Sequence, residues 1–137
     1  MNTTEKENFL KGLKIMHKAM CLGPAILMVL FNFLLINKSS DLGTAPGPIG
    51  IFILVISASV LMGSIFLFKK NTKQINGILS EDNKERWREA YILKWALLEG
   101  AALINILIYY FAEPNPILLI VALLLLLYLF ISGPKFS

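Results

Sequence analysis

Glu99 is the residue of this sequence best placed to do chemistry, because it is an acid inside a long apolar segment. It is the eighth of the 21 residues from Ile92 to Ala112, about 10 Å from one end of that segment if the segment is helical. A carboxylate at such a depth in a membrane is costly unless it is protonated, paired or facing water. It is therefore either a carrier of protons or cations, or a ligand for a cationic substrate, or it is a protonated or hydrogen-bonded clamp between helices. We favour the clamp, because neither a second acid nor a relay accompanies it.

The partners available to Glu99 must come from another helix or from solvent. Lys94 lies five residues away, roughly 140° around a helix, and is badly placed to neutralise the carboxylate. Ser64 and Ser59 bracket the same depth on a second apolar segment, and His17 lies nearer the membrane surface but could reach inward. The candidate ion or substrate site therefore consists of Glu99, Ser64, Ser59 and His17.

Two pairs of small residues predict close helix packing, since small residues four apart let helix backbones approach each other in a membrane. The pairs are Ala19 with Gly23 and Ala96 with Gly100. A shift of 77 residues superimposes the two pairs and aligns residues 15–31 with residues 92–108, with five identities. We therefore expect two related helical hairpins.

Asn32 and Asn105 lie at similar depths, about 20 Å from one boundary. On neighbouring helices they could pair through their amides, so we assign both to helix packing.

The elements that must position these residues are four apolar segments. We expect an all-α, integral membrane four-helix bundle in one domain, 1–137, because about 20 helical residues cross a bilayer. The expected spans are about 19–36, 49–68, 92–112 and 116–132, with an amphipathic lead-in at 5–18 and a cytoplasmic loop at 69–91. The last span is almost pure Leu and Ile, so we expect it to face lipid while the first three make the contacts.

The lead-in has two interpretations. It lies on the membrane surface as an interfacial helix, or it extends the first span with snorkelling lysines, and we favour the extension because Ile15 falls on the lysine side. Thr3 or Thr4 is the expected N-cap of this segment. In the loop, Ser80 is the expected cap of the next helix.

The composition supports the membrane assignment and excludes several kinds of functional site. The chain is 56% hydrophobic and 16% charged, against about 25% charged in soluble domains. A single cysteine, Cys21, excludes an internal disulfide and a thiolate-only metal site, and one histidine excludes bis-His haem ligation within one chain. We find no phosphate loop, Ser/His/Asp set or HExxH motif, and so expect no enzyme, metal or cofactor.

The basic residues predict the orientation. Twelve of the 13 lysines and arginines lie on one side of the expected spans, Lys38 being the exception, and basic loops face the cytoplasm. Both termini are therefore expected inside, with the basic side near anionic headgroups rather than bound to nucleic acid. Two groups of aromatic residues are expected to anchor the chain at the two interfaces; they are Trp87, Tyr91 and Trp95, and Tyr109, Tyr110 and Phe111.

Two stretches, residues 88–103 and 19–27, resemble uncharacterised small four-helix proteins of bacterial inner membranes. The acid followed by small residues at Glu99 is also similar to the proteolipid ring subunits of rotary ATPases, and that resemblance implies a proton-bearing carboxylate. The glycine-repeat helix of those subunits is missing here. We expect a noncatalytic subunit that self-associates or joins a membrane complex; the alternative is a proton- or cation-coupled transporter or channel subunit that uses Glu99.

Overall fold

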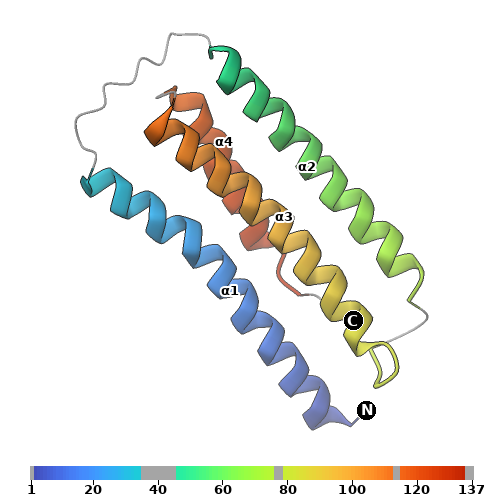
Figure 1. Cartoon of the computed structure of the whole chain (residues 1–137). Coiled ribbons are helices and arrows are strands. Elements are labelled where there is room, and N and C mark those ends of the chain that lie inside the picture. Colours follow the sequence, from blue (N-terminus) through green and yellow to red (C-terminus); the bar gives the residue numbers. More distant parts are fainter. Residues whose placement is uncertain (1, 35–45, 76–78, 113–114, 135–137) are drawn as a thin grey trace.

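The computed structural model of the chain describes residues 2–34, 46–75, 79–112 and 115–134, and within them the expected all-helical fold is confirmed. Four helices follow in order: α1 (Thr3–Leu34), α2 (Pro48–Lys73), α3 (Lys84–Phe111) and α4 (Pro116–Ile131) (Figure 1). The first three are long and apolar enough to cross a membrane. Residues 35 and 36 of the first expected span, and Lys38, lie outside the described residues.

The other three helices are arranged around α3. It packs along α2 and α4 and also contacts α1, whereas the described residues of α1 and α2 make no contact with each other. Figure 1 shows α1 and α2 on opposite sides of the α3–α4 pair. The start of α1, the end of α2 and the start of α3 lie together, at what we call the terminal end, and α4 runs toward that end but stops level with His17 and Trp95. A pair of equivalent hairpins is not shown by this arrangement.

The central position of α3 follows from the spacing of its buried residues. Trp95, Leu98, Ala102 and Ile106 are fully buried and recur every three or four residues, so they form one stripe along the helix. Ala101 and Ala102, the two residues that follow the predicted Gly100, are the small residues buried in this part of α3.

The last helix, which we expected to face lipid while the first three make the contacts, also contributes to the core. Leu118, Ala122, Leu125 and Leu129 of α4 are buried, and this face packs against α3. The opposite face remains exposed, including Leu124. A helix that is Leu and Ile on every side carries no stripe that would have revealed its packing face.

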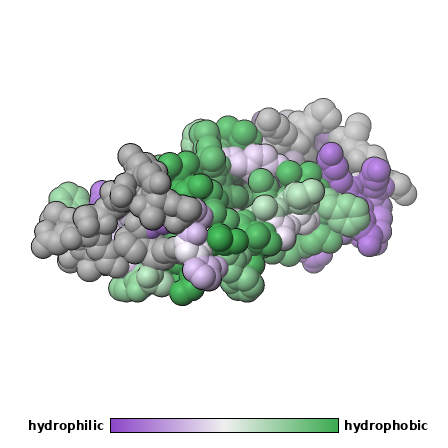
Figure 2. Space-filling model, turned by 90° about the horizontal axis from the view of Figure 1, so that it is seen from above, coloured by the Kyte–Doolittle hydropathy of each residue, from purple (hydrophilic) through white to green (hydrophobic). Residues whose placement is uncertain are grey.

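A broad apolar surface surrounds this core. Figure 2 shows hydrophobic side chains over the middle of the drawn face and hydrophilic ones gathered mainly at one end. Large apolar side chains are exposed on all four helices; examples are Phe33, Met62, Phe111 and Phe130. Such a surface is normal in contact with acyl chains and is far larger than the patches of soluble monomers.

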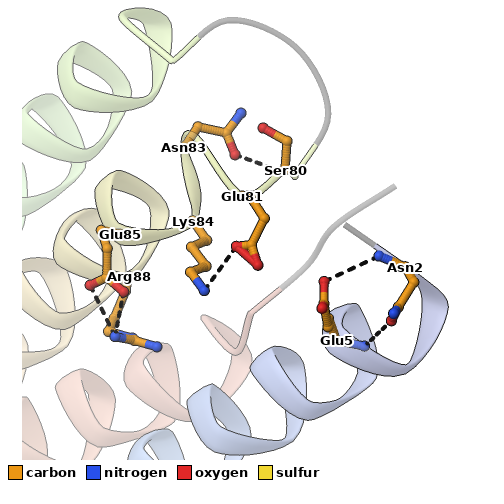
Figure 3. Close-up of polar contacts among 8 residues, drawn as sticks. All are labelled: Asn2, Glu5, Ser80, Glu81, Asn83, Lys84, Glu85 and Arg88. Atoms are coloured by element: carbon orange, nitrogen blue, oxygen red, sulfur yellow. Dashed lines mark hydrogen bonds and ion pairs between the residues drawn. The ribbon is translucent and has the colours of Figure 1, made fainter.

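The helix starts differ from the expected caps. At α1 the cap is Asn2, whose Oδ1 accepts from the Glu5 N–H at 2.8 Å while its own N–H donates to Glu5 Oε2 at 3.3 Å (Figure 3). This reciprocal pair is a capping box, and it leaves Thr3 as the first helical residue. Residues 5–18 continue the same helix without a break.

At α3 the cap is Asn83 rather than Ser80. The Ser80 N–H donates to Asn83 Oδ1 at 2.8 Å, so residues 80–83 form a turn and the helix begins after it (Figure 3). Glu81 and Lys84 form an ion pair of 3.0 Å beside this turn.

Candidate functional site

The side chain of His17 joins three helices near the terminal end. It lies on α1, is 7% exposed and packs its ring against Trp95 of α3, with 4.9 Å between the ring centroids. Its Nε2–H donates to the Leu129 carbonyl in the last turn of α4. His17 is therefore a buried contact between α1, α3 and α4, and the described bond commits its Nε2 to that contact.

Trp95 makes a second bond to the same end of α4. Its indole Nε1–H donates to the Ser132 carbonyl at 2.8 Å, and the side chain is 0% exposed. The Leu129 carbonyl also accepts from the Ser132 N–H at 3.2 Å, so the side chains from α1 and α3 add partners to the carbonyls at the end of α4. The prediction that Trp95 and Tyr91 are interfacial anchors is wrong, because both are buried. Tyr109 and Tyr110 are buried as well, and Phe111 is exposed.

Cys21 lies one helical turn above His17 on α1. Its Sγ is 3.7 Å from His17 Nε2. Because Nε2 carries the proton that is donated to Leu129, it has no lone pair with which to accept the thiol proton. His17 Nε2 is thus not the base for the Cys21 thiol in this arrangement.

Glu99 is half-buried on α3 and faces α1, not α2. A Cβ built on Gly23 of α1 would lie 3.5 Å from Glu99 Oε1, an ordinary van der Waals contact, so the carboxylate lies beside the backbone of α1. Among the described residues, no ion pair or hydrogen bond holds this side chain. The carboxylate could therefore hold a proton or a cation between α1 and α3.

The structure does not bring the predicted serines to Glu99. The hydroxyl of Ser64 is buried and donates to the Leu61 carbonyl at 2.8 Å. Ser59 is exposed and its hydroxyl donates to the Val55 carbonyl at 2.9 Å. Both hydroxyls are thus satisfied within α2, which is the usual way for serine to reside in an apolar helix.

A polar contact further from the terminal end joins α2 to α3. Asn105 is 0% exposed, and its Nδ2 donates to Ser57 Oγ at 2.6 Å and to the Ala101 carbonyl at 2.8 Å. Ser57 in turn donates to the Ile53 carbonyl. Asn105 therefore holds α3 against α2, which is the helix-packing role that we predicted for it. Ser57 was missed by the sequence reasoning, although a serine in a mostly apolar helix was an available signal.

Asn32 has a different partner from the one expected. Its Oδ1 accepts from the Tyr110 hydroxyl at 3.1 Å, which joins α1 to α3. The two asparagines therefore do not pair with each other. The predicted equal depth is also wrong: His17 lies beside Trp95 and Asn32 beside Tyr110, so Asn105 lies about five residues nearer the terminal end than Asn32, and it faces α2.

The predicted pairs of small residues lie mostly on the outside of this single chain. Ala19, Gly23 and Ala96 are exposed, and a Cβ at Gly100 would meet nothing within 4 Å. Ala96 and Gly100 line a shallow groove of about 190 Å³ between α2 and α3. We call it the α2/α3 groove; Ile56, Ser57, Val60 and Ile104 also line it.

The described residues contain no group of three or more His, Cys, Asp or Glu side chains that could hold a metal ion. Comparison with family models, with curated proteins and with solved structures finds no match for this chain. Function must accordingly be argued from the geometry of the described residues.

Proposed function

We propose that this chain is a noncatalytic integral membrane protein that associates with itself or with a larger membrane complex. The observation that carries the proposal is the uncovered α2/α3 groove, in which Ala96 and Gly100 present small residues four apart. In membranes such a surface is the usual contact between helices, because it lets two backbones approach closely. The two small residues lack this contact within the chain.

The proposal includes a topology and a location. All four helices cross the membrane, with α4 as the shortest at 16 residues, about 24 Å long. The terminal end faces the cytoplasm, because all the basic residues except Lys38 lie on that side of the spans. The resemblance of residues 88–103 and 19–27 favours a bacterial inner membrane.

The proposal is tested by the substitution Gly100→Leu. A Cβ at this position has open space around it, so the leucine should not disturb the packing of the single chain. We expect normal membrane insertion and loss of the oligomer or complex, measured by native mass spectrometry of the protein extracted in mild detergent.

The matched control is Ala25→Leu, which adds a leucine at another exposed small residue, on α1. The control should assemble as the wild type does. An oligomer that survives Gly100→Leu, or a wild-type protein found only as a free monomer, would contradict the proposal.

A second candidate function is carriage of protons or cations by Glu99. The observation that favours it is the position of the carboxylate beside Gly23 with no bonding partner among the described residues. The test is labelling by a hydrophobic carbodiimide over a range of pH, with Glu99→Gln as the control. Labelling that falls as pH rises and is absent in the variant, together with loss of the cellular phenotype, supports a carrier. No labelling and an unchanged phenotype would remove it.

A further inference from the structure

A second groove lies on the other side of α2, between α2 and α4, and we call it the α2/α4 groove. It has a volume of about 320 Å³ and its walls are almost entirely apolar. Its principal lining residues are Leu54, Leu61 and Ile65 of α2 and Val121, Leu124 and Tyr128 of α4. It exists because these helices pack against α3 and hardly against each other.

A positive charge lies where this groove approaches the terminal end. The Lys94 ammonium of α3 is 5.3 Å from the centre of the Tyr128 ring, which also lines the groove, and 4.6 Å from the Phe68 ring of α2. Two aromatic faces thus hold the ammonium between α2 and α4. The charge and the groove are continuous through Tyr128.

Lys94 has no acidic partner among the described residues, where the two ion pairs are Glu81–Lys84 and Glu85–Arg88. A cation held within an apolar segment is costly unless an anion or water accompanies it. The groove therefore combines an apolar channel with an unpaired cation at one end. An anion with a long apolar tail is complementary to both.

The length of the groove fits such a tail. From Leu54 to Ile65 the α2 wall extends eleven residues, about 16 Å along the helix. This is close to half of the roughly 30 Å hydrocarbon core, the depth that one acyl chain covers. Lys94 and the exposed Lys69 next to Phe68 then lie where a headgroup would be.

From this juxtaposition we propose that the α2/α4 groove binds one anionic phospholipid, with an acyl chain in the groove and its phosphate at Lys94. A helix from another protein fits less well, because the walls consist mainly of large side chains and lack the small residues four apart that helix contacts use. The inference rests on the proposed membrane location of the helices, but it uses neither the α2/α3 groove nor Glu99.

The test measures lipid binding to the full chain in detergent by native mass spectrometry, with phosphatidylglycerol and phosphatidylcholine carrying identical acyl chains. We expect the wild type to bind phosphatidylglycerol about fivefold more tightly, the factor typical of one basic residue at an anionic surface. Lys94→Gln should abolish this preference, and Lys94→Arg should retain it. Lys14→Gln, at an exposed lysine of α1, should leave it unchanged.

Two further measurements distinguish a bound lipid from free phosphate or a second protein helix in the α2/α4 groove. Ala58→Phe places a large side chain on the groove wall and should weaken the binding of both lipids, while inorganic phosphate alone should not compete. Unchanged preference in Lys94→Gln, competition by phosphate alone, or loss of an oligomer in Ala58→Phe with lipid binding intact would each overturn the proposal. Thermal melting followed by circular dichroism establishes that each variant is folded before binding is compared.

Discussion

The two grooves beside α2 differ in side-chain size and in charge. The α2/α3 groove contains Ala96 and Gly100 at helical spacing and no charged side chain. The α2/α4 groove is larger, is lined mostly by leucine, isoleucine and valine, and approaches the cation of Lys94 at one end. The difference indicates that two sides of one helix can suit different neighbours. A second helix needs small residues for close approach, whereas a flexible acyl chain fits between large ones.

The comparison assumes that α3 supports both grooves. Trp95→Ala tests this assumption and is the variant for which we expect the largest effect. The side chain is fully buried, stacks on His17 and bonds to the end of α4. Its loss should lower the free energy of unfolding by about 3 kcal/mol, the lower end of the range for buried tryptophan. Equilibrium unfolding in mixed detergent micelles measures this, with Phe111→Ala as an exposed aromatic control on the same helix. Equal destabilisation of the two variants would contradict the central role of α3.

The next test measures each groove variant for the property that we assign to the other groove. Gly100→Leu should leave the roughly fivefold preference for phosphatidylglycerol intact, because a Cβ at that position contacts no other residue. Lys94→Gln should leave the oligomer intact. If either variant changes both lipid preference and assembly, the two grooves form one functional surface and the comparison fails.

Ser57 lines both grooves, so Ser57→Ala examines the wall between them. The variant removes the hydroxyl that accepts from Asn105 and should destabilise the fold by about 0.6 kcal/mol, the average for hydrogen bonds between membrane helices. A double-mutant cycle with Asn105→Leu in unfolding experiments isolates this contribution. A coupling of zero would show that the described bond contributes nothing.

The smallest effect is expected at Tyr110, away from both grooves. Tyr110→Phe removes the bond to Asn32, whose side chain is exposed, and should change stability by less than about 0.6 kcal/mol without altering lipid preference or assembly. Tyr109→Phe is the control, since its hydroxyl makes no described bond. A change in lipid preference in Tyr110→Phe would extend the α2/α4 site beyond the residues named for it.

The sequence predicted the helices better than it predicted their contacts. The four apolar helices needed only local information, and they were confirmed. The predicted partners of Glu99 and Asn105 do not contact them in the structure, because the partner of a side chain depends on which helices are neighbours. Residue counts give the position of a side chain along its own helix, whereas the offset between two helices and the neighbour that a side chain faces are set by packing.

What the sequence determined by itself is therefore the all-helical fold and the apolar character of its segments, since hydropathy and helix length are local properties. Tertiary structure alone decided that α3 is central, that one face of α4 is buried, and that Trp95 and His17 bond to carbonyls of the α4 terminus. The physical reason is that lipid and protein interior are both apolar. Hydrophobicity places a side chain within the membrane but does not distinguish the neighbour it will contact.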